Sequence, residues 1–575
     1  MTTVPPLQLR DVSFSYPSSV EPVLRNINLT INSGEFVGII APTGSGKSTL
    51  LGLLGGIIPH YVRGDLQGQV LLEGVDTREL SLRKFASRVG MVLQDPDSQL
   101  FNLLVRDEIV WGLENRGVAR AQMDARLDHI LTFFNITALR DRITYDLSGG
   151  EKQRVVMAAV AVSQPDILLF DNPTSQLDPL GSELVIESVR RILEAHRTVV
   201  MVEDKLDELL EHADRLILLH RGEILLDCPP AAFVRHEAEL ERAGIVPSSV
   251  AQLALRLARA GHLSGTLPLT LADAVPVFRG LFPGAAPAPA PALPDAVPVA
   301  AERVSIAVRD VRFVYPPPRP IPAVKGVSLT FERASFVAII GQNGSGKTTL
   351  ARCMSGYLTP TSGTVLVGGE NVHQLKTFRR ARRIGYVFQN PSTQLFRQSV
   401  YDEVAFSLEY QGIAPAEAAG RVESILRMLD LWEQRELHPF RLSLGNKQRL
   451  AIACIAVLQP DALIVDEPTT GQDPRHARAV MELLTRLRDQ YGTTIITITH
   501  AMSLAAEYCD RVVAMCRGEV LLDGTPRDVF AQREVLATTF VKPPSVTQLA
   551  LELGIVPPPL NVDEAATMMH ERLVR

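Results

Sequence analysis

"GQNGSGKTTL", residues 341–350, has a close counterpart in "APTGSGKSTL", residues 41–50. The apolar run "EFVGII" (35–40) precedes the first copy, and a helix-like run begins at Lys47. A Gly-rich turn between a strand and a helix lets backbone N–H groups close around phosphate oxygens, and the helix directs its positive end at the same anion. The pattern therefore predicts a nucleotide-phosphate loop in each copy.

The whole chain is duplicated around these loops. The two copies are collinear, because the offset is 347 − 47 = 300 at the loop lysines and 466 − 171 = 295 further on. Three more matching pairs support this: "LRDVSFSYP" with "VRDVRFVYP" (9–17 and 308–316), "VGMVLQDPDSQLF" with "IGYVFQNPSTQLF" (89–101 and 384–396), and "LSGGEKQR" with "LSLGNKQR" (147–154 and 442–449).

Strand-like and helix-like runs alternate within each copy. Apolar residues at 185, 189 and 192 have the spacing of a helix face, and "TVVMVE" (198–203) reads as a strand. The alternation predicts an α/β fold with a mainly parallel sheet in each copy. Asp171 and Asp466 each end an apolar strand, which suits a carboxylate that holds Mg²⁺ through water.

The domain limits follow from the repeat and from composition. Alternating Ala and Pro predict a stiff, extended spacer between the copies. The smaller similarity of "PSSVAQLALRL" to "PSVTQLALEL" predicts a small extension after each domain. The expected order is a main domain at 1–245, its extension at 246–282, the Ala/Pro linker at 283–302, a second main domain at 303–538 and its extension at 539–575.

Composition excludes several classes of protein. The formal charge is −6 and charged residues make up 21% of the 575, so there is no electrostatic footprint for nucleic acid. The five cysteines form no CxxC pair, which argues against zinc sites or a disulfide framework. We expect no secretory signal and no membrane span, since the best apolar run is only "LAIACIAVL" (450–458). Any membrane role must then use a partner.

At this point both copies resemble the nucleotide-binding subunits of ABC transporters, and "LSGGEKQR" is similar to the signature of that family. The resemblance implies two tandem P-loop ATPase domains, each with a mainly parallel sheet core, an antiparallel β subdomain and a helical signature subdomain. It also implies ATP and Mg²⁺ as cofactors. In this family two domains pair head to tail, and each ATP lies between the phosphate loop of one domain and the signature of the other.

The resemblance assigns roles to individual residues. Glu467 matches the general base, His500 the switch histidine and Gln389 the glutamine that senses metal and water. Asp178 and Asp473 match the loop that links the two sites. The expected ATP-binding residues are Tyr16, Thr43, Gly44, Ser45, Gly46, Lys47, Ser48, Thr49, Tyr315, Asn343, Gly344, Ser345, Gly346, Lys347, Thr348 and Thr349, with Ser148, Gly149, Gly150, Glu151, Ser443 and Gly445 from the signatures. The expected metal-binding residues are Ser48, Gln94, Asp171, Thr348, Gln389 and Asp466. Tyr16 and Tyr315 could instead be ordinary strand residues.

The two copies differ where chemistry is expected. The first has Ala41, Asn172 and Asp204 where the family has Gly, Glu and His, while the second has all three expected residues but a damaged signature with Leu444 and Asn446. Under head-to-tail pairing every loss falls in one site. An amide cannot accept a proton from water near neutral pH. The sequence therefore predicts one hydrolytic site and one degenerate site.

One branch of the family is favoured. The run Gln-x-Pro-x-x-Gln-Leu-Phe, followed by Val-x-Asp-Glu, resembles the ATPases of energy-coupling factor (ECF) importers for vitamins, vitamin precursors or metal ions. This implies a transmembrane scaffold subunit, a substrate-binding membrane subunit and a place on the cytoplasmic face of the cell membrane, with one chain supplying both ATPase halves. Four residues of these runs are candidates for the contact with the scaffold: Leu100, Phe101, Leu395 and Phe396. The alternative is that they are ordinary residues of the domain core.

Two alternatives stay open. One is the tandem ATPase of a sugar importer, against which the Gln-Leu-Phe run speaks. The other is a soluble ribosome-associated tandem ABC ATPase, which usually has a charged helical joint and two intact signatures. Here the joint is Ala-Pro and one signature is damaged.

Overall fold

The computed structural model describes residues 4–17, 19, 21–42, 44–175, 177, 179–195, 197–204, 206–282, 303–316, 320–470 and 472–574. Thr43, Asp178 and the 283–302 linker lie outside these residues. By its internal contacts the chain divides into two compact units, residues 1–273 and 274–575. Each unit is described by itself, and the domain limits given above stay a prediction.

The core of the first unit is a six-stranded sheet in which only β9 and β10 pair antiparallel. Its strand order is β10 (Glu223–Cys228), β9 (Arg215–His220), β3 (Phe36–Ile40), β8 (Thr198–Glu203), β7 (Ile167–Asp171) and β6 (Val89–Val92). A separate antiparallel sheet contains β2 (Leu24–Ile31), β1 (Leu7–Ser15), β4 (Asp65–Leu72) and β5 (Val75–Asp76).

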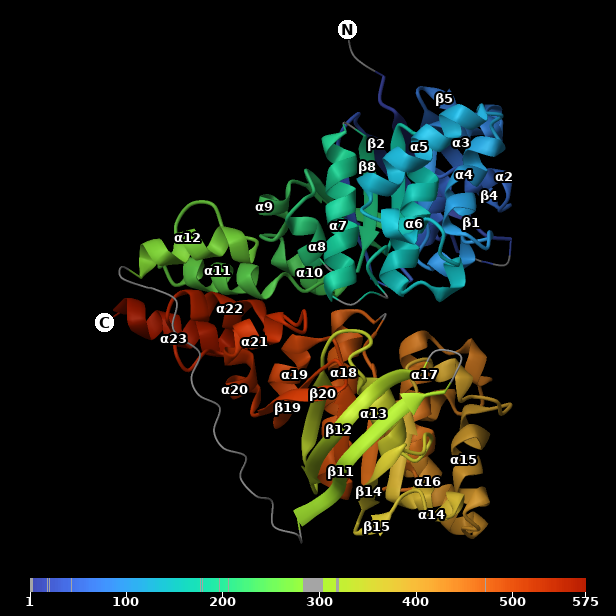
Figure 1. Ribbon diagram of the computed structural model, residues 1–575. Coiled ribbons are helices and arrows are strands. Elements are labelled where there is room, and N and C mark those ends of the chain that lie inside the picture. Colours follow the sequence, from blue (N-terminus) through green and yellow to red (C-terminus); the bar gives the residue numbers. More distant parts are fainter. Residues whose placement is uncertain are drawn as a thin grey trace. The chain divides into compact units, whose positions relative to one another are not determined.

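The helices between residues 4 and 282 fall into groups by their position in the chain (Figure 1), and the boundary between the two units at residue 273 passes through the last of them. One starts at the phosphate loop, three form the helical subdomain, and the last two belong to the expected extension. In chain order they are α1 (Lys47–Leu54), α2 (Ile57–His60), α3 (Leu82–Arg88), α4 (Val105–Glu114), α5 (Arg120–Phe133), α6 (Gly149–Ala161), α7 (Pro179–Glu194), α8 (Leu206–Leu210), α9 (Pro230–Phe233), α10 (Glu237–Ala243), α11 (Ser249–Arg259) and α12 (Leu271–Leu281).

The second unit repeats this plan. Its sheet has the order β16 (Ile384–Val387), β17 (Ala462–Asp466), β18 (Thr494–Ile498), β13 (Phe336–Ile340), β19 (Arg511–Cys516) and β20 (Glu519–Gly524), beside an antiparallel sheet of β12 (Ile321–Glu332), β11 (Val304–Tyr315), β14 (Ser362–Val367) and β15 (Glu370–Asn371). Its helices are α13 (Lys347–Met354), α14 (Thr377–Arg383), α15 (Val400–Tyr410), α16 (Pro415–Met428), α17 (Leu444–Ala456), α18 (Pro474–Tyr491), α19 (Met502–Tyr508), α20 (Pro526–Ala531), α21 (Arg533–Ala537), α22 (Ser545–Glu552) and α23 (Val562–Val574).

The central strand of each sheet is buried on both faces. In β13 the side chains of Phe336 and Ile340 enter the apolar cluster on the helical side, while Val337 and Ile339 enter the cluster on the antiparallel-sheet side. This is the two-residue alternation of a strand, and it explains why the strand reads as an unbroken apolar run. The expected face of α7 is likewise buried, at Val185, Val189 and Ile192. The predicted α/β fold with its three-part domains is confirmed.

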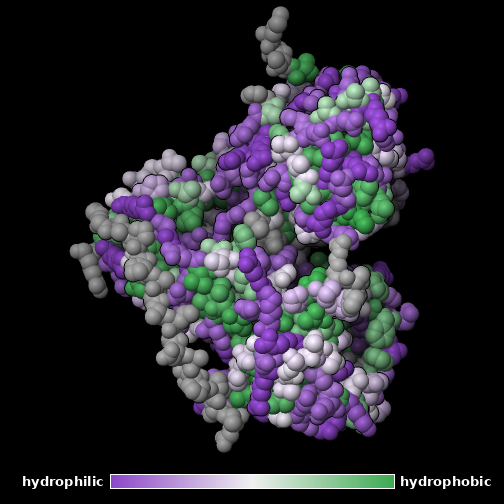
Figure 2. All heavy atoms as spheres, viewed as in Figure 1, coloured by the Kyte–Doolittle hydropathy of each residue, from purple (hydrophilic) through white to green (hydrophobic). Residues whose placement is uncertain are grey.

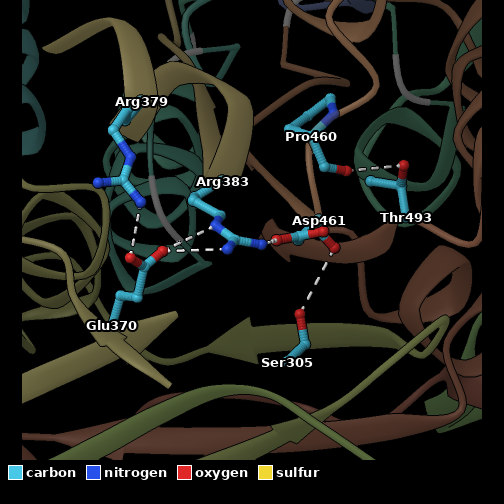
Figure 3. A network of polar contacts seen from close by, with 7 residues as sticks. All are labelled: Ser305, Glu370, Arg379, Arg383, Pro460, Asp461 and Thr493. Atoms are coloured by element: carbon cyan, nitrogen blue, oxygen red, sulfur yellow. Dashed lines mark hydrogen bonds and ion pairs between the residues drawn. The ribbon is translucent and has the colours of Figure 1, made fainter. Parts of the chain in front are cut away.

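An ion-pair network fastens the antiparallel sheet of the second unit to the core sheet (Figure 3). Arg383, at the end of α14, donates to Glu370 on β15 at 3.0 Å and to Asp461, just before β17, at 2.7 Å. Arg379 donates to the same Glu370 carboxylate at 2.8 Å. In the first unit Arg88 forms the corresponding contact with Asp166 at 2.6 Å and a longer one with Glu73 at 3.5 Å.

Candidate functional site

The phosphate loop of the second unit requires its glycines. The φ angles are +145° at Gly341 and +99° at Gly346, and a Cβ atom at either position would lie 2.3 Å from a backbone oxygen, of Met515 and of Ala323 respectively. In the first unit Ala41 is buried and is not among the residues with positive φ. Ala41 therefore fits its loop without left-handed strain, and this substitution alone does not abolish the loop.

The two loop lysines have different partners. Lys347 is buried and donates to the carbonyls of Gly341 at 2.7 Å and of Gln342 at 2.8 Å. Lys47 donates to the carbonyl of Ala41 at 3.0 Å and forms an ion pair with the carboxylate of Asp204. Asp204 stands where the second copy has His500. In the first unit the carboxylate of Asp204 is thus paired with the lysine that would otherwise contact a phosphate.

The oxygen atoms beside the second loop suit Mg²⁺. The Thr348 hydroxyl donates to one oxygen of Asp466 at 3.4 Å. A hydroxyl and a carboxylate at the end of a phosphate loop are the hard oxygen donors that Mg²⁺ prefers, together with phosphate oxygens. Burial raises the pKa of Asp466 above its usual value, although its partner Tyr386 acts in the opposite direction. Bound there, Mg²⁺ would polarise phosphoryl oxygens.

The structure brings the expected catalytic residues of the second unit together around Glu467. Gln389 and Thr470 each donate to one oxygen of Glu467 at 2.9 Å. His500 Nε2 lies 3.3 Å from the other oxygen. Glu467 follows β17 with a φ of +48°, an unfavourable backbone for a glutamate that tends to persist at functional sites.

The surroundings of Glu467 keep its carboxylate ionised. Burial alone raises its pKa, but His500, Thr470 and the charge of Lys347 together outweigh burial, so that the pKa lies below the usual value. An ionised carboxylate can accept a proton from a water molecule. The roles of these residues stay predictions, but their geometry is that of a base held by three neighbours.

Asn172 in the first unit has the same backbone and none of this chemistry. Its φ is +43°, its side chain is buried, and its amide oxygen has no hydrogen-bond partner among the described residues. Gln94, the counterpart of Gln389, donates to Ser175 at 3.2 Å instead. The strained turn after the strand is therefore retained in both units, while the ionisable group is found only in the second.

The two signature segments also differ. Ser148 caps α6 in a reciprocal capping box with Glu151, and Gly149 and Gly150 begin the helix, so its free N–H groups are open to an anion. Ser443 caps α17, but Leu444 at the first helical position is 48% exposed. Asn446 donates to Gln434 at 2.9 Å rather than closing a capping box. An exposed branched side chain thus stands at the start of the second signature.

The two tyrosines at the sheet ends lie beside their phosphate loops. The Tyr16 hydroxyl is 3.0 Å from the Thr49 hydroxyl, and the Tyr315 hydroxyl is 3.1 Å from that of Thr349. Each ring packs edge-on against the phenylalanine two residues earlier. Each tyrosine ring therefore lies where it could stack on the base of a nucleotide. Its role in stacking on adenine stays a prediction.

The candidate partner contacts separate into two kinds. Leu100 and Leu395 are buried in the domain core. For these two residues the predicted contact with the scaffold is wrong, and the alternative of ordinary core residues holds. Phe101 and Phe396 are 65% and 60% exposed. Hydrophobic side chains are visible among hydrophilic ones on the α15 side of the second unit (Figure 2). Further exposed apolar residues of the two helical subdomains are Leu103, Trp111, Ile143 and Tyr145 in the first unit and Tyr410, Leu437 and Phe440 in the second.

Buried side chains hold these phenylalanines in place. Glu403 accepts the backbone N–H groups of Phe396 at 2.8 Å and Arg397 at 2.7 Å, and Glu108 does the same for Phe101 and Asn102. This explains the Val-x-Asp-Glu run that follows each Gln-Leu-Phe. The sequence analysis missed this role, and it also missed Thr470 and Tyr386. An alignment of the two copies would have drawn attention to Tyr386, because this position is Met91 in the first copy.

Comparison with known proteins gives a consistent result. The family model described as "ABC transporter" matches residues 24–175 and 324–470. An ABC transporter ATP-binding protein of Methanosarcina mazei, so named provisionally, is 37% identical over 98% of this chain and 97% of its own length. A protein of Caldanaerobacter subterraneus with the same description is 35% identical over 95% and 96%. The solved structure of cbiO1 from Clostridium perfringens, titled as part of the ABC transporter complex cbiONQ, is 33% identical, covers 44% of this chain and 98% of its own, and has a TM-score of 0.38. Among the described residues, no helix has both the length and the apolarity to cross a bilayer.

Proposed function

The chain belongs to the ABC transporter ATP-binding family, whose members bind ATP with Mg²⁺ and couple its hydrolysis to transport, and from that premise we propose that it powers an ECF-type importer through two unequal ATP sites. The imported substrate would be a vitamin, a vitamin precursor or a metal ion. In importers of this kind the specificity lies in a separate membrane subunit, and we propose the same arrangement here.

Exposed phenylalanines support the ECF assignment. The Gln-Leu-Phe run that distinguishes this branch places Phe101 and Phe396 on the surface, each fixed by a buried glutamate. Aromatic side chains that are rigid and accessible suit the reception of an apolar helix from another protein. The proposed occupants are helices of the transmembrane scaffold subunit, which would hold the chain at the cytoplasmic face of the cell membrane.

One observation carries the proposed asymmetry: Asp204 forms an ion pair with Lys47, whereas Glu467 accepts hydrogen bonds from Gln389 and Thr470 and lies beside His500. A carboxylate paired with the loop lysine opposes phosphate binding in two ways: it repels the phosphate, and it neutralises the charge of the lysine. Under head-to-tail pairing the phosphate loop of the first domain would meet the signature with Leu444. The site formed by the second phosphate loop and the first signature would hydrolyse ATP.

Copurification with membrane proteins tests the proposal. The full chain, tagged and expressed in its native cells, should retain a polytopic scaffold subunit in detergent, and a small substrate-binding membrane protein with it. The doubly substituted chain Phe101→Ala and Phe396→Ala should lose both. Recovery of ribosomes, or of the two transmembrane subunits and the soluble binding protein of a sugar importer, would overturn the ECF assignment and leave the ATPase assignment intact.

A further inference from the structure

The second unit has a buried tyrosine under its metal-binding carboxylate. The hydroxyl of Tyr386, on β16, donates to Asp466 Oδ2 at 2.7 Å, and the Tyr386 side chain is almost completely buried. The other oxygen, Oδ1, faces the Thr348 hydroxyl. The carboxylate is therefore held at one oxygen by the protein and presents the other toward the phosphate loop.

Arg352 adds a positive charge to the same group. It lies one turn after Thr348 on α13, so the two side chains share a face of that helix. Burial raises the pKa of the Tyr386 hydroxyl, and the charge of Arg352 opposes that change. The charge of Arg352 also acts on Asp466. The hydrogen bond from Tyr386 to Asp466 thus lies within the influence of the Arg352 charge, beside the proposed Mg²⁺ position.

Neither of the supporting residues is present in the first unit. Met91 stands in place of Tyr386 and Gly52 in place of Arg352, although Asp171 and Ser48 match Asp466 and Thr348. A thioether cannot donate a hydrogen bond, and a glycine carries no charge. The sulfur of Met91 lies against Gly55, 2.9 Å from where a Cβ atom would stand. The first unit fills this space with apolar atoms instead.

We propose that Tyr386 and Arg352 are positioning residues that orient Asp466 for Mg²⁺ in the second unit, and that Met91 and Gly52 leave Asp171 a weaker metal ligand in the first. Outer residues that hydrogen-bond to metal ligands orient them and strengthen metal binding. The difference between the two units then extends beneath the residues that touch nucleotide. The inference rests on the proposed metal-binding role of Asp466.

Metal-dependent nucleotide binding tests the inference without hydrolysis. The full chain carrying Lys47→Ala, which silences the first loop, is titrated with ADP in the presence of Mn²⁺ and again with EDTA, and bound Mn²⁺ is read by electron paramagnetic resonance. Tyr386→Phe should weaken Mn²⁺–ADP binding about tenfold and leave metal-free ADP binding unchanged. Arg352→Gln should act in the same direction to a smaller extent, and it serves as the second variant if Tyr386→Phe does not fold.

The controls separate the possible failures. Tyr357→Phe removes a hydroxyl from a ring whose centroid is 5.6 Å from that of Tyr386, and it should change neither titration. Asp466→Asn should abolish the metal dependence, and if it does not, the proposed metal site itself is wrong. If Asp466→Asn has its effect but Tyr386→Phe and Arg352→Gln do not, or weaken both titrations equally, only the positioning role is overturned.

Discussion

The first and second units share a backbone and differ in the side chains that would act on ATP. The left-handed turn after the strand occurs at both Asn172 and Glu467, with φ of +43° and +48°. Only Glu467 has an ionisable group there, with three neighbours that favour its charge. The comparison teaches that the shape of an ATPase site is set by the strand-and-loop framework, while its chemistry depends on a few side chains that can be lost without altering that framework.

The largest expected effect tests the inequality of the two sites. Glu467→Gln should lower steady-state ATP hydrolysis at least about 100-fold, because an amide cannot act as a general base. Asn172→Ala should change the rate less than about twofold, since its position has no base to lose. Phosphate release by the purified chain measures both. Comparable losses from the two substitutions would show that the sites are equivalent.

The exposed phenylalanines come next in size. Phe101→Ala and Phe396→Ala should each weaken binding to the membrane partner about 30-fold, as expected for a central aromatic contact worth about 2 kcal/mol. Hydrolysis by the isolated chain should stay the same. The control Phe540→Ala alters another exposed phenylalanine of the second unit and should leave partner binding intact. If only one of Phe101 and Phe396 matters, the two surfaces are not used alike.

The ion pair in the first unit predicts a gain of binding. Asp204→Asn frees Lys47 and removes a negative charge near the phosphates, so the first loop should bind ATP about tenfold more tightly. The measurement is calorimetric titration of ATP into a chain carrying Lys347→Ala. Glu211→Gln neutralises an exposed acid seven residues further along the chain and should have no effect. Unchanged or weaker binding by Asp204→Asn would contradict the inhibitory role of this carboxylate.

The smallest expected effect concerns the ion pairs of Arg383 in the second unit and Arg88 in the first. Arg383→Ala breaks contacts with Glu370 and Asp461, and we expect the apparent Tm to fall by about 2 °C, because partly exposed ion pairs contribute about 1 kcal/mol or less. Arg88→Ala should lower it less, since Arg88 has one close partner in Asp166 and a weaker one in Glu73 at 3.5 Å. Arg309→Ala, at an exposed position, is the control in scanning fluorimetry. A larger shift for Arg88→Ala would reverse this ranking.

Local pattern made most of the fold predictable. The Gly-rich loops lie between an apolar strand and a helix, and such neighbours in sequence are neighbours in space. The buried face of α7 followed from residue spacing for the same reason. The differences at Asn172, Asp204 and Leu444 could also be identified from sequence, because each copy provides an internal standard for the other.

Contacts between distant residues could not be predicted in this way. Tyr386 and Asp466 are 80 positions apart and Lys47 and Asp204 are 157 apart, and their meeting depends on the order of strands in the sheet. The burial of Leu100 beside the exposure of Phe101 depends on which way a loop turns. That direction is set by Glu108, whose carboxylate accepts the backbone N–H groups of Phe101 and Asn102.

The two glutamates beneath the phenylalanines have a mechanical consequence. Phe396 follows Gln389 by seven residues, and the intervening loop is fastened at both ends, by Gln394 to the backbone of Phe388 and Tyr386 and by Glu403 to the backbone of Phe396. Hydrogen bonds at both ends of so short a segment restrict its internal motion. We therefore expect a displacement of the Phe396 ring to reach the Gln389 amide, which donates to Glu467, the proposed general base.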